Sequence, residues 1–586
     1  MEIIEKHPQF RTIKIEIFNK KASKKAEDIF KELQFGNILN LKKAYYSYFE
    51  KYEAILQELI PAFNISEMHS KTQSKKECES ISQRMINEAK MIAKQLKEKQ
   101  NFYLHPVETG KIIANICGTW TYLDAKSSGF GLTRTKLLQP HSAQVISVLL
   151  LLGMNLTQGS IANHLLQINT GEGKSVTIAI SAITLSLLGY YVDVACYSVY
   201  LADRDARAFK ELFKLFGELD EEISYKNFDD LIQQHVSTIG DTRELARQLL
   251  KEKVTGNTKK QENKSNKILF IDEVDVFFGG NFLGETLNPC IIIQDECFQK
   301  LLYYIWENKQ SLLEDHKLAK SRIKQHDLIK QFVINYPNIK EFIDKSINEI
   351  LVALKNVDYG NDHGYLEKNN GIGYPDSSRG GDINYNLFYR YNTVFKYIEK
   401  KEFFSQTFMK TKFNSNIGLI LTTGSLSYAE IPKNYNLILG VTGTLSSLSP
   451  FEKSIIEGYG ITKQTIIPSI FKKDKLKGEK DILVCGGEKD AEDDKSYFNV
   501  IKKEIEINVS KDRAVLIVFE NHKRLDEFID FTSSHKYKDL DGMRCNYLTE
   551  VTDDNNRDLY INSAAICSQI TFLTRIFGRG SDFVCR

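Results

Sequence analysis

The sequence predicts an α/β protein built on a parallel sheet, and two observations support this fold class. Between residues 137 and 279, the short apolar runs HLLQI, YVDVACY and ILFI alternate with helical stretches, and each run ends at polar or glycine-rich residues. Apolar strands that alternate with helices are typical of parallel sheets with helices on both faces. A second strand–helix pattern, DILVCGG and then AVLIVFENHKRLDEFI, begins near residue 480.

Length and composition indicate a soluble protein of several domains. The 586 residues exceed what one hydrophobic core usually supports, and 42% of them are hydrophobic and 26% charged. A net charge of +2 provides no general basic surface for nucleic acid. The nine cysteines include no Cys-x-x-Cys pair, which favours reduced thiols in a cytosolic compartment over disulfides or a zinc site.

The order of patterns along the chain predicts five regions. Residues 1–105 are expected to be helical, because KKAEDIFKEL and SISQRMINEAKMIAKQLKEKQ place apolar residues three and four apart. Residues 280–430 are rich in Tyr, Asn and Gly, and GIGYPDSSRGGDINYN predicts turns rather than helices or strands. The regions are 1–105 (helical), 106–279 (first parallel sheet), 280–430 (less regular, inserted), 431–475 (strand-like return to the first sheet, NLILGVTGT) and 476–586 (second sheet).

No targeting or membrane segment is expected. The N-terminal MEIIEKHPQF is charged from its second residue, unlike a secretory signal. Residues 175–192 are uncharged and long enough to span a membrane, so a span is one interpretation. Gly189 and the following YYVDVACY favour the other interpretation, a buried helix and then a strand. We therefore expect a cytoplasmic protein.

The segment TGEGKS is the first candidate for chemistry. It follows the strand-like HLLQI and precedes the helical SVTIAISAITLSLL, which is the order that a phosphate-binding loop requires. Glycine lets the backbone approach phosphate oxygens, Lys174 would reach the β- and γ-phosphates, and the Ser175 hydroxyl would bind Mg²⁺. Ile168 replaces the glycine that usually opens the pattern, at the strand end and away from the phosphates. The candidate loop residues are Thr170, Gly171, Glu172, Gly173, Lys174 and Ser175.

The segment KILFIDEVD supplies the second half of a nucleotide site. Asp272 follows four apolar residues and is therefore expected at the carboxyl end of a strand, where open α/β sheets bind ligands. Asp272 would hold Mg²⁺ through water, and Glu273 would orient and deprotonate the attacking water. An Asp-Glu pair alone is also compatible with a solvated strand end, but the loop upstream favours a joint site.

Five motifs together resemble one family. TGEGKS, SVYLADRDA, IDEVD, GVTGTL and GRGSDF occur in the order found in SecA, an ATP-driven motor of protein export related to superfamily 2 helicases. The resemblance implies a RecA-like P-loop ATPase domain with a parallel sheet, a second and incomplete RecA-like domain, and ATP with Mg²⁺ as cofactors. It also implies that residues 280–430 stand where SecA inserts its preprotein-binding domain.

The resemblance assigns further residues. Gln144 matches the glutamine that reads adenine in SecA, although it is equally a polar residue on an apolar helix. Arg204 and Asp205 match the motif that couples nucleotide to the substrate channel, or they form a capping salt bridge. Thr442 and Thr444 match the motif that links hydrolysis to domain closure.

The last motif lies in the second RecA-like domain. Arg579, Gly580 and Asp582 match a GRGTD motif, and its arginine would stabilise charge on the transferred phosphoryl group. SecA continues beyond this motif with a second arginine, a helical scaffold and a wing domain, whereas this sequence ends at GRGSDFVCR. We expect either a fragment of a longer protein or a relative that has lost part of the motor.

Three functions remain open from the sequence. The first is a SecA-like ATPase acting on a polypeptide, with peripheral membrane association. The second is a non-hydrolysing ATP switch or scaffold, which would bind ATP without turnover. The third is a superfamily 2 RNA helicase, which would need basic residues along the cleft. The sequence makes no prediction of the oligomeric state.

Overall fold

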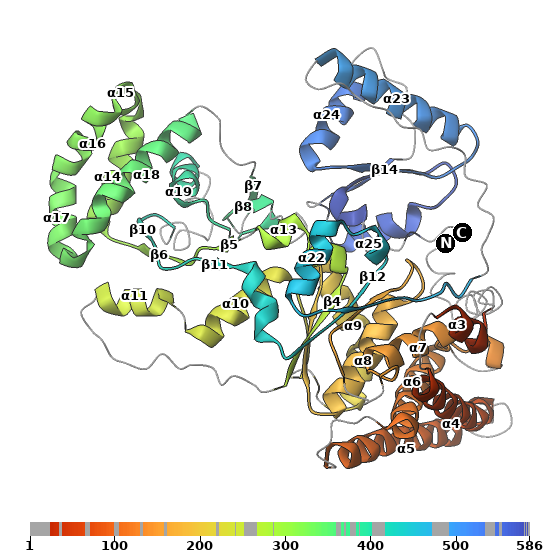
Figure 1. Cartoon of the computed structure of the whole chain (residues 1–586). Helices are drawn as coiled ribbons and strands as arrows, with labels where there is room; N and C mark the ends of the chain where they lie inside the picture. Colours follow the sequence, from red (N-terminus) through yellow and green to blue (C-terminus); the bar gives the residue numbers. More distant parts are fainter. Residues whose placement is uncertain are drawn as a thin grey trace. The chain divides into compact units, whose positions relative to one another are not determined.

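The computed structural model describes most of the chain, in two compact units. One unit comprises Met1–His235, Glu262–Glu285 and Ser427–Lys477, and the other comprises Val236–Gln261, Thr286–Leu426 and Gly478–Arg586. Figure 1 carries the element labels used here. The described residues are 24–33, 38–64, 71–98, 105–128, 133–156, 161–217, 219, 222–240, 242–250, 266–284, 286–358, 365–368, 371–375, 383–385, 387–400, 416–471, 491–533, 545–549, 552, 554–578, 581 and 583.

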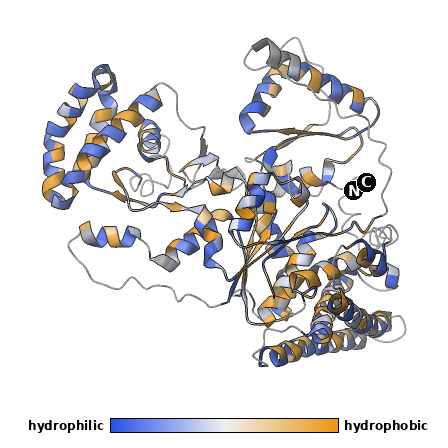
Figure 2. Cartoon of the chain, in the orientation of Figure 1, coloured by the Kyte–Doolittle hydropathy of each residue, from blue (hydrophilic) through white to orange (hydrophobic). Residues whose placement is uncertain are grey.

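Three long helices near the N-terminus pack together in the first unit. They are α4 (Leu39–Asn64), α5 (Lys71–Glu98) and α6 (Pro106–Ser128), and they follow the short α3 (Ala26–Glu32). Figure 2 shows hydrophobic and hydrophilic residues interspersed along α4 and α5, as expected for helices that bury one face. A Cβ at Gly110 of α6 would collide with the carbonyl oxygen of Ala44, so this glycine lets α4 and α6 approach closely. The described residues of the predicted helical region 1–105 form α3, α4 and α5, and the helical part continues through α6.

A six-stranded parallel sheet forms the centre of the first unit. Its strands are β1 (His164–Gln167), β2 (Tyr191–Ala195), β3 (Ile223–Lys226), β4 (Lys267–Asp272), β12 (Leu437–Thr442) and β13 (Lys463–Ile466), in the order β13-β1-β12-β4-β2-β3. The consecutive residues Leu269 and Phe270 point to opposite faces of the sheet, and both are 0% exposed. Burial of both faces explains the apolar runs, and the predicted α/β class is confirmed.

Helices surround this sheet. They include α7 (Ser142–Leu151), α8 (Lys174–Leu187), α9 (Val199–Leu215), α10 (Phe228–Ile239), α12 (Val274–Phe277), α13 (Gly280–Leu283) and α22 (Pro450–Gly458), with 3₁₀ turns at Arg134–Lys136, Tyr428–Asn434 and Leu445–Ser447. The uncharged run forms α8, ends before Gly189 (φ 94°) and continues as β2, which is the buried-helix interpretation. Among the described helices, none combines the length and apolar run that a membrane crossing needs.

The inserted region is more regular than the sequence indicated. It contains α14 (Glu296–Glu307), α15 (Lys309–Glu314), α16 (His316–Gln325), α17 (Asp327–Asn335), α18 (Lys340–Asp358) and α19 (Arg390–Glu399), with strands β6 (Cys290–Ile293), β7 (Leu366–Lys368), β8 (Gly371–Pro375), β9 (Ile383–Asn384) and β10 (Leu419–Thr422). The prediction that GIGYP forms only turns was wrong, because this stretch is strand β8. The prediction of an irregular region was also wrong. Its Tyr and Asn content obscured helical spacing such as Phe298, Leu301 and Ile305, which face one core.

A smaller parallel sheet lies in the C-terminal part. Its order is β14-β16-β15, and its elements are α23 (Ala491–Val509), β14 (Val515–Phe519), α24 (His522–Ser533), β15 (Cys545–Leu548), α25 (Asp554–Ser563), β16 (Ile570–Thr574) and a 3₁₀ turn at Arg575–Gly578. Phe498, Phe528 and Phe572 form its core. The strand and helix predicted at AVLIVFENHKRLDEFI are confirmed, whereas DILVCGG lies outside the described residues. Short elements complete the chain at α11 (Thr242–Leu250), β5 (Thr286–Leu287), β11 (Leu426–Ser427) and a 3₁₀ turn at Pro337–Ile339.

Candidate nucleotide site

Three adjacent strands bring the predicted motifs to one edge of the large sheet. β1, β12 and β4 are neighbours, with Gln167 opposite Thr442 and Val441 opposite Asp272. Parallel strands end on the same side, so the segments after β1, β12 and β4 meet there. Those segments are TGEGKS, GT and EVD. This carboxyl edge is where open α/β sheets bind their ligands.

The loop after β1 has the backbone that phosphate binding requires. Gly171 and Gly173 adopt φ angles of 79° and 81°, in the left-handed region that glycine occupies without strain. Helix α8 begins at Lys174, directly after Gly173. The free N–H groups of the first helical turn therefore lie at the loop, where they favour an anion.

Ile168 is part of the core rather than of the loop. Its side chain is 2% exposed and belongs to the main hydrophobic cluster of the unit. Its N–H donates to the Thr442 carbonyl over 2.9 Å, which extends the pairing of β1 with β12 by one residue. A glycine at this position would remove a core side chain without adding freedom to the loop.

The acidic pair after β4 is held in an uncommon backbone conformation. Glu273 has a φ of 60°, which non-glycine residues adopt rarely and mostly where the surrounding structure imposes it. Its N–H donates to the carbonyl oxygen of Val441 on β12 over 3.1 Å. This bond ties Glu273 to the neighbouring strand and fixes the direction in which it leaves β4.

Lys174 and Glu273 form an ion pair across the site. The Lys174 Nζ lies 2.5 Å from the Glu273 Oε1, and both side chains are 14% exposed. The two residues predicted to bind phosphate and to activate water therefore contact each other directly. An incoming phosphate would compete with Glu273 for this ammonium group.

Asp272 is a buried carboxylate with unused bonding capacity. Within the described residues, its Oδ1 is buried and accepts no hydrogen bond. Burial, and then the negative charge of Glu273, raise the pKa of Asp272 from 3.8 to about 7, while the Lys174 ammonium acts in the opposite direction. A cation at Oδ1 would satisfy the orphaned atom and favour the ionised form.

Ser175 is oriented by a residue of α9. Its Oγ donates to Asp205 Oδ2 over 2.9 Å, and Arg204 Nε donates to the other oxygen, Oδ1, over 2.8 Å. Arg204 and Asp205 therefore form a salt bridge inside α9 rather than at its cap, and Asp205 also contacts the loop. The predicted role of the two residues in coupling stays a prediction. Because the Ser175 proton points to Asp205, the lone pairs of the hydroxyl oxygen are left for a metal ion.

The TGT segment joins the acidic segment to the loop. The Thr442 side chain, 0% exposed, donates from Oγ1 to Asp275 Oδ1 over 3.1 Å, and the Thr444 N–H donates to the same Oγ1 over 3.2 Å. A Cβ at Gly443 would lie 3.2 Å from Thr170 Oγ1, so the segment runs beside the loop. Sequence reasoning gave Asp275 no role, although it belongs to the quoted IDEVD.

Comparison with protein families accounts for most of this chain. The SecA DEAD-like domain family matches residues 62–450, which is more than half of the 586 residues. This chain belongs to the SecA DEAD-like domain family. The resemblance inferred from the five motifs is thereby confirmed, and four of those motifs lie within the matched residues.

Two curated relatives are both named protein translocase subunit SecA. The protein of Francisella tularensis subsp. tularensis is 21% identical over 522 residues, covering 84% of this chain and 53% of the relative. That of Campylobacter concisus is 27% identical over 167 residues, covering 28% of this chain and 18% of the relative. The chain spans about half the length of the first of these relatives.

One solved structure, that of the yeast DEAD-box splicing factor Prp28, matches part of this chain. The match covers 76% of this chain and 68% of the Prp28 chain at 12% identity. Its TM-score is 0.18, which supports no comparison of folds.

Gln144 lies against the loop of this SecA DEAD-like domain. Its side chain is 6% exposed, its Nε2 donates to the Gly173 carbonyl over 3.5 Å, and its Oε1 accepts from the His141 N–H over 2.8 Å. A Cβ at Gly173 would clash with the Gln144 amide nitrogen. Gln144 therefore contacts the loop backbone, and its reading of adenine stays a prediction.

The remaining predicted residues lie in the C-terminal part of the SecA-like chain. Within QITFLT, the residues Ile570–Thr574 form β16, and Arg575–Gly578 continues as a 3₁₀ turn toward GRGSDF. Arg579, Gly580 and Asp582 lie outside the described residues. Their predicted approach to the phosphates stays a prediction.

Proposed function

We propose that this chain binds Mg²⁺–ATP at Thr170–Ser175 and hydrolyses it. The observation that carries the proposal is the buried Asp272 Oδ1, which has no hydrogen-bond partner among the described residues, beside a loop with two left-handed glycines. Oxygen ligands suit Mg²⁺, and Asp272 with Ser175 would hold it, Asp272 through water. The ion would neutralise charge on the phosphates. The loop N–H groups and Lys174 would bind and orient those phosphates.

The proposed chemistry requires Glu273 to leave Lys174. When phosphate oxygens take the Lys174 ammonium, the carboxylate of Glu273 is released from its 2.5 Å contact. Its fixed backbone would then direct it at a water molecule, from which Oε1 can accept a proton. The same ion pair supports a second candidate, a non-hydrolysing switch in which Glu273 stays bound to Lys174 when nucleotide is present.

We further propose that hydrolysis acts on a polypeptide, in translocation or remodelling, at the periphery of a membrane. The support is family membership and the names of the relatives. The segment Thr286–Leu426 has an apolar core of its own, which includes Leu302, Phe332 and Phe395. We propose that this segment is the substrate-binding insertion.

Nucleotide binding by Lys174→Ala tests the proposal most directly. We expect the variant to weaken Mg²⁺–ADP binding by about tenfold or more, because a charged hydrogen bond contributes about 1.5–3 kcal/mol. The matched control is Lys214→Ala on α9, whose ammonium lies 3.6 Å from Glu211 at the surface. Equal affinity of the wild type and Lys174→Ala in calorimetric titration would contradict the site. Binding of ATP without turnover would favour the switch.

A further inference from the structure

Glu172 belongs to the proposed phosphate loop, but the proposed nucleotide chemistry gives its charged side chain no role. It stands between Gly171 and Gly173, yet its side chain is buried, with 4% of the residue exposed. Asn169 Nδ2 donates to its Oε1 over 3.4 Å. A buried carboxylate needs hydrogen-bond donors or a cation, so its partners identify what the loop is attached to.

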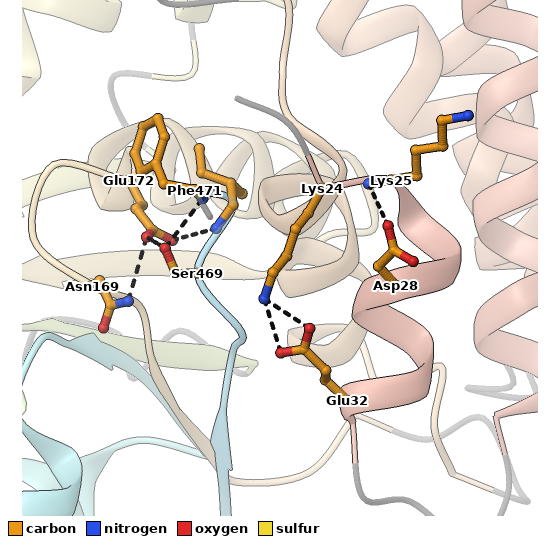
Figure 3. Close-up of polar contacts among 9 residues, drawn as sticks. Lys24, Lys25, Asp28, Glu32, Asn169, Glu172, Ser469 and Phe471 are labelled. Atoms are coloured by element: carbon orange, nitrogen blue, oxygen red, sulfur yellow. Dashed lines mark hydrogen bonds and ion pairs between the residues drawn. The ribbon is translucent and has the colours of Figure 1, made fainter. Parts of the chain in front are cut away.

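The partners lie on the segment that follows β13. The Ser469 Oγ donates to Glu172 Oε1 over 2.5 Å, and the Ile470 N–H donates to Oε2 over 3.4 Å. Figure 3 shows the Glu172 side chain directed toward Ser469, with Asn169 on the other side of the carboxylate. A segment almost 300 residues away in the sequence therefore holds the middle of the phosphate loop.

The same segment is bonded to the first described residues of the chain. The Lys24 N–H donates to the Ile470 carbonyl over 3.2 Å. Lys24 begins the turn into α3 and also pairs with Glu32 at the end of that helix, with an Nζ–Oε1 distance of 2.8 Å. Figure 3 shows the contact between Lys24 and Glu32. The Ile470 N–H thus bonds to the loop residue Glu172, and the Ile470 carbonyl oxygen bonds to Lys24 before α3.

The charge of Glu172 gives this connection a consequence for binding. A carboxylate among the N–H groups that receive phosphate would repel the phosphate, unless other groups hold the carboxylate away from those N–H groups. The Glu172 carboxylate accepts hydrogen bonds from Ser469, Ile470 and Asn169. Lys174 pairs with Glu273 rather than with Glu172. Loss of the Ser469 hydroxyl would free Glu172 to compete for those N–H groups.

We infer that Glu172 is a positioning residue that fixes the phosphate loop on the segment 467–471, and that this segment transmits loop occupancy to α3. The inference rests on the proposed function, which names nucleotide as the ligand of the loop, whereas the contacts from Glu172 to Ile470 and from Ile470 to Lys24 are features of the structure itself. Nucleotide binding that restricts the motion of the loop would also restrict Ile470, and through it the contact with Lys24. By linkage, loosening the segment lowers nucleotide affinity.

Three serine variants test the positioning role. Ser469→Ala should weaken Mg²⁺–ADP binding about three- to tenfold, because one hydrogen bond to a charged group is lost. Ser469→Thr keeps the hydroxyl and should restore affinity to within about twofold of the wild type. The matched control is Ser186→Ala on α8, which removes a similar bond, Ser186 Oγ to Glu222 at 2.7 Å, at the far end of the helix. Equal affinity of Ser469→Ala and wild type would overturn the positioning role.

Hydrogen exchange of the nucleotide-free chain tests the connection separately. Ser469→Ala should accelerate exchange in residues 169–178 and also in residues 24–33, whereas Ser186→Ala should leave both unchanged. Acceleration in the loop alone would overturn the transmission to α3. If the wild type binds no ADP but Ser469→Ala still accelerates both segments, the proposed function fails and the connection stands. If the wild type binds ADP and neither segment responds, the connection fails and the proposed function stands.

Discussion

The ends of β4 and β14 present similar sequences in different surroundings. Each strand belongs to a parallel sheet and is followed by a glutamate that pairs with a cation. After β4, Glu273 meets Lys174 at 2.5 Å with both side chains 14% exposed. After β14, Glu520 meets Arg575 at 2.9 Å, with the side chains 68% and 53% exposed. The same local pattern, an apolar strand that ends in a charged pair, therefore occurs in a buried and in an exposed setting.

Burial of the strand itself makes the difference. The inner four residues of β4 are buried, whereas Leu516 and Val518 of β14 are 41% and 50% exposed. Water near β14 screens the charges of its pair and competes for their hydrogen bonds. At β4 the charged side chains have little contact with water, and burial raises the pKa of Asp272. The candidate site therefore lies at the strand end where solvent contributes least to the charged groups.

Glu273→Gln should give the largest effect at the buried edge. If Glu273 is the base, turnover of ATP should fall about 10²–10⁴-fold, because the amide cannot accept the proton. Nucleotide binding should be kept or strengthened, since Lys174 loses its competing partner. Steady-state hydrolysis beside ADP titration measures both. Turnover equal to that of the wild type would show that Glu273 is not the base.

The variants Leu439→Ala and Leu516→Ala compare how much a leucine side chain contributes to stability in each sheet. Leu439 in β12 is 0% exposed, and its loss should lower the free energy of unfolding by about 2–5 kcal/mol. Leu516 in β14 is 41% exposed, so the same truncation should cost about 1 kcal/mol or less. Calorimetric scans of both variants test this. Equal losses would mean that β14 is as buried in solution as β12.

The sequence predicted β4 and β14 as strands but not this difference. KILFID and AVLIVF are both apolar runs, and an apolar run gives the strand without saying how much of each face is covered. Coverage depends on helices supplied from elsewhere in the chain. For β4 these include α8, whose apolar residues share one core with the strand.

Much of the candidate site was predictable for a local reason. TGEGKS and IDEVD each follow an apolar strand, and parallel strands place such segments at one edge. The contacts of Glu172 with Ser469 and of Thr442 with Asp275 were not predictable, because they join residues 297 and 167 positions apart. No local pattern marks either partner. The irregular interpretation of residues 280–430 failed because composition was weighed above helical spacing.

Asp272→Asn should change how stability depends on pH. With the pKa raised to about 7, folded Asp272 keeps a proton between about pH 4 and 7 that the unfolded chain releases. The wild type should therefore lose stability as pH rises through this window, by up to a few kcal/mol. Asp272→Asn should show a smaller fall in unfolding temperature between pH 5 and pH 8. Identical pH profiles would contradict the raised pKa.

Glu520→Gln is the counterpart of Glu273→Gln at the exposed edge and should give the smallest effect. Its pair with Arg575 lies in solvent, so the free energy of unfolding should change by about 0.5 kcal/mol or less. Raising the ionic strength should remove even that difference, since salt screens exposed charges. Thermal unfolding at low and high salt measures the effect. A loss that exceeds about 1 kcal/mol and persists at high salt would mean that Glu520 is buried in solution, and the contrast between β4 and β14 would then fail.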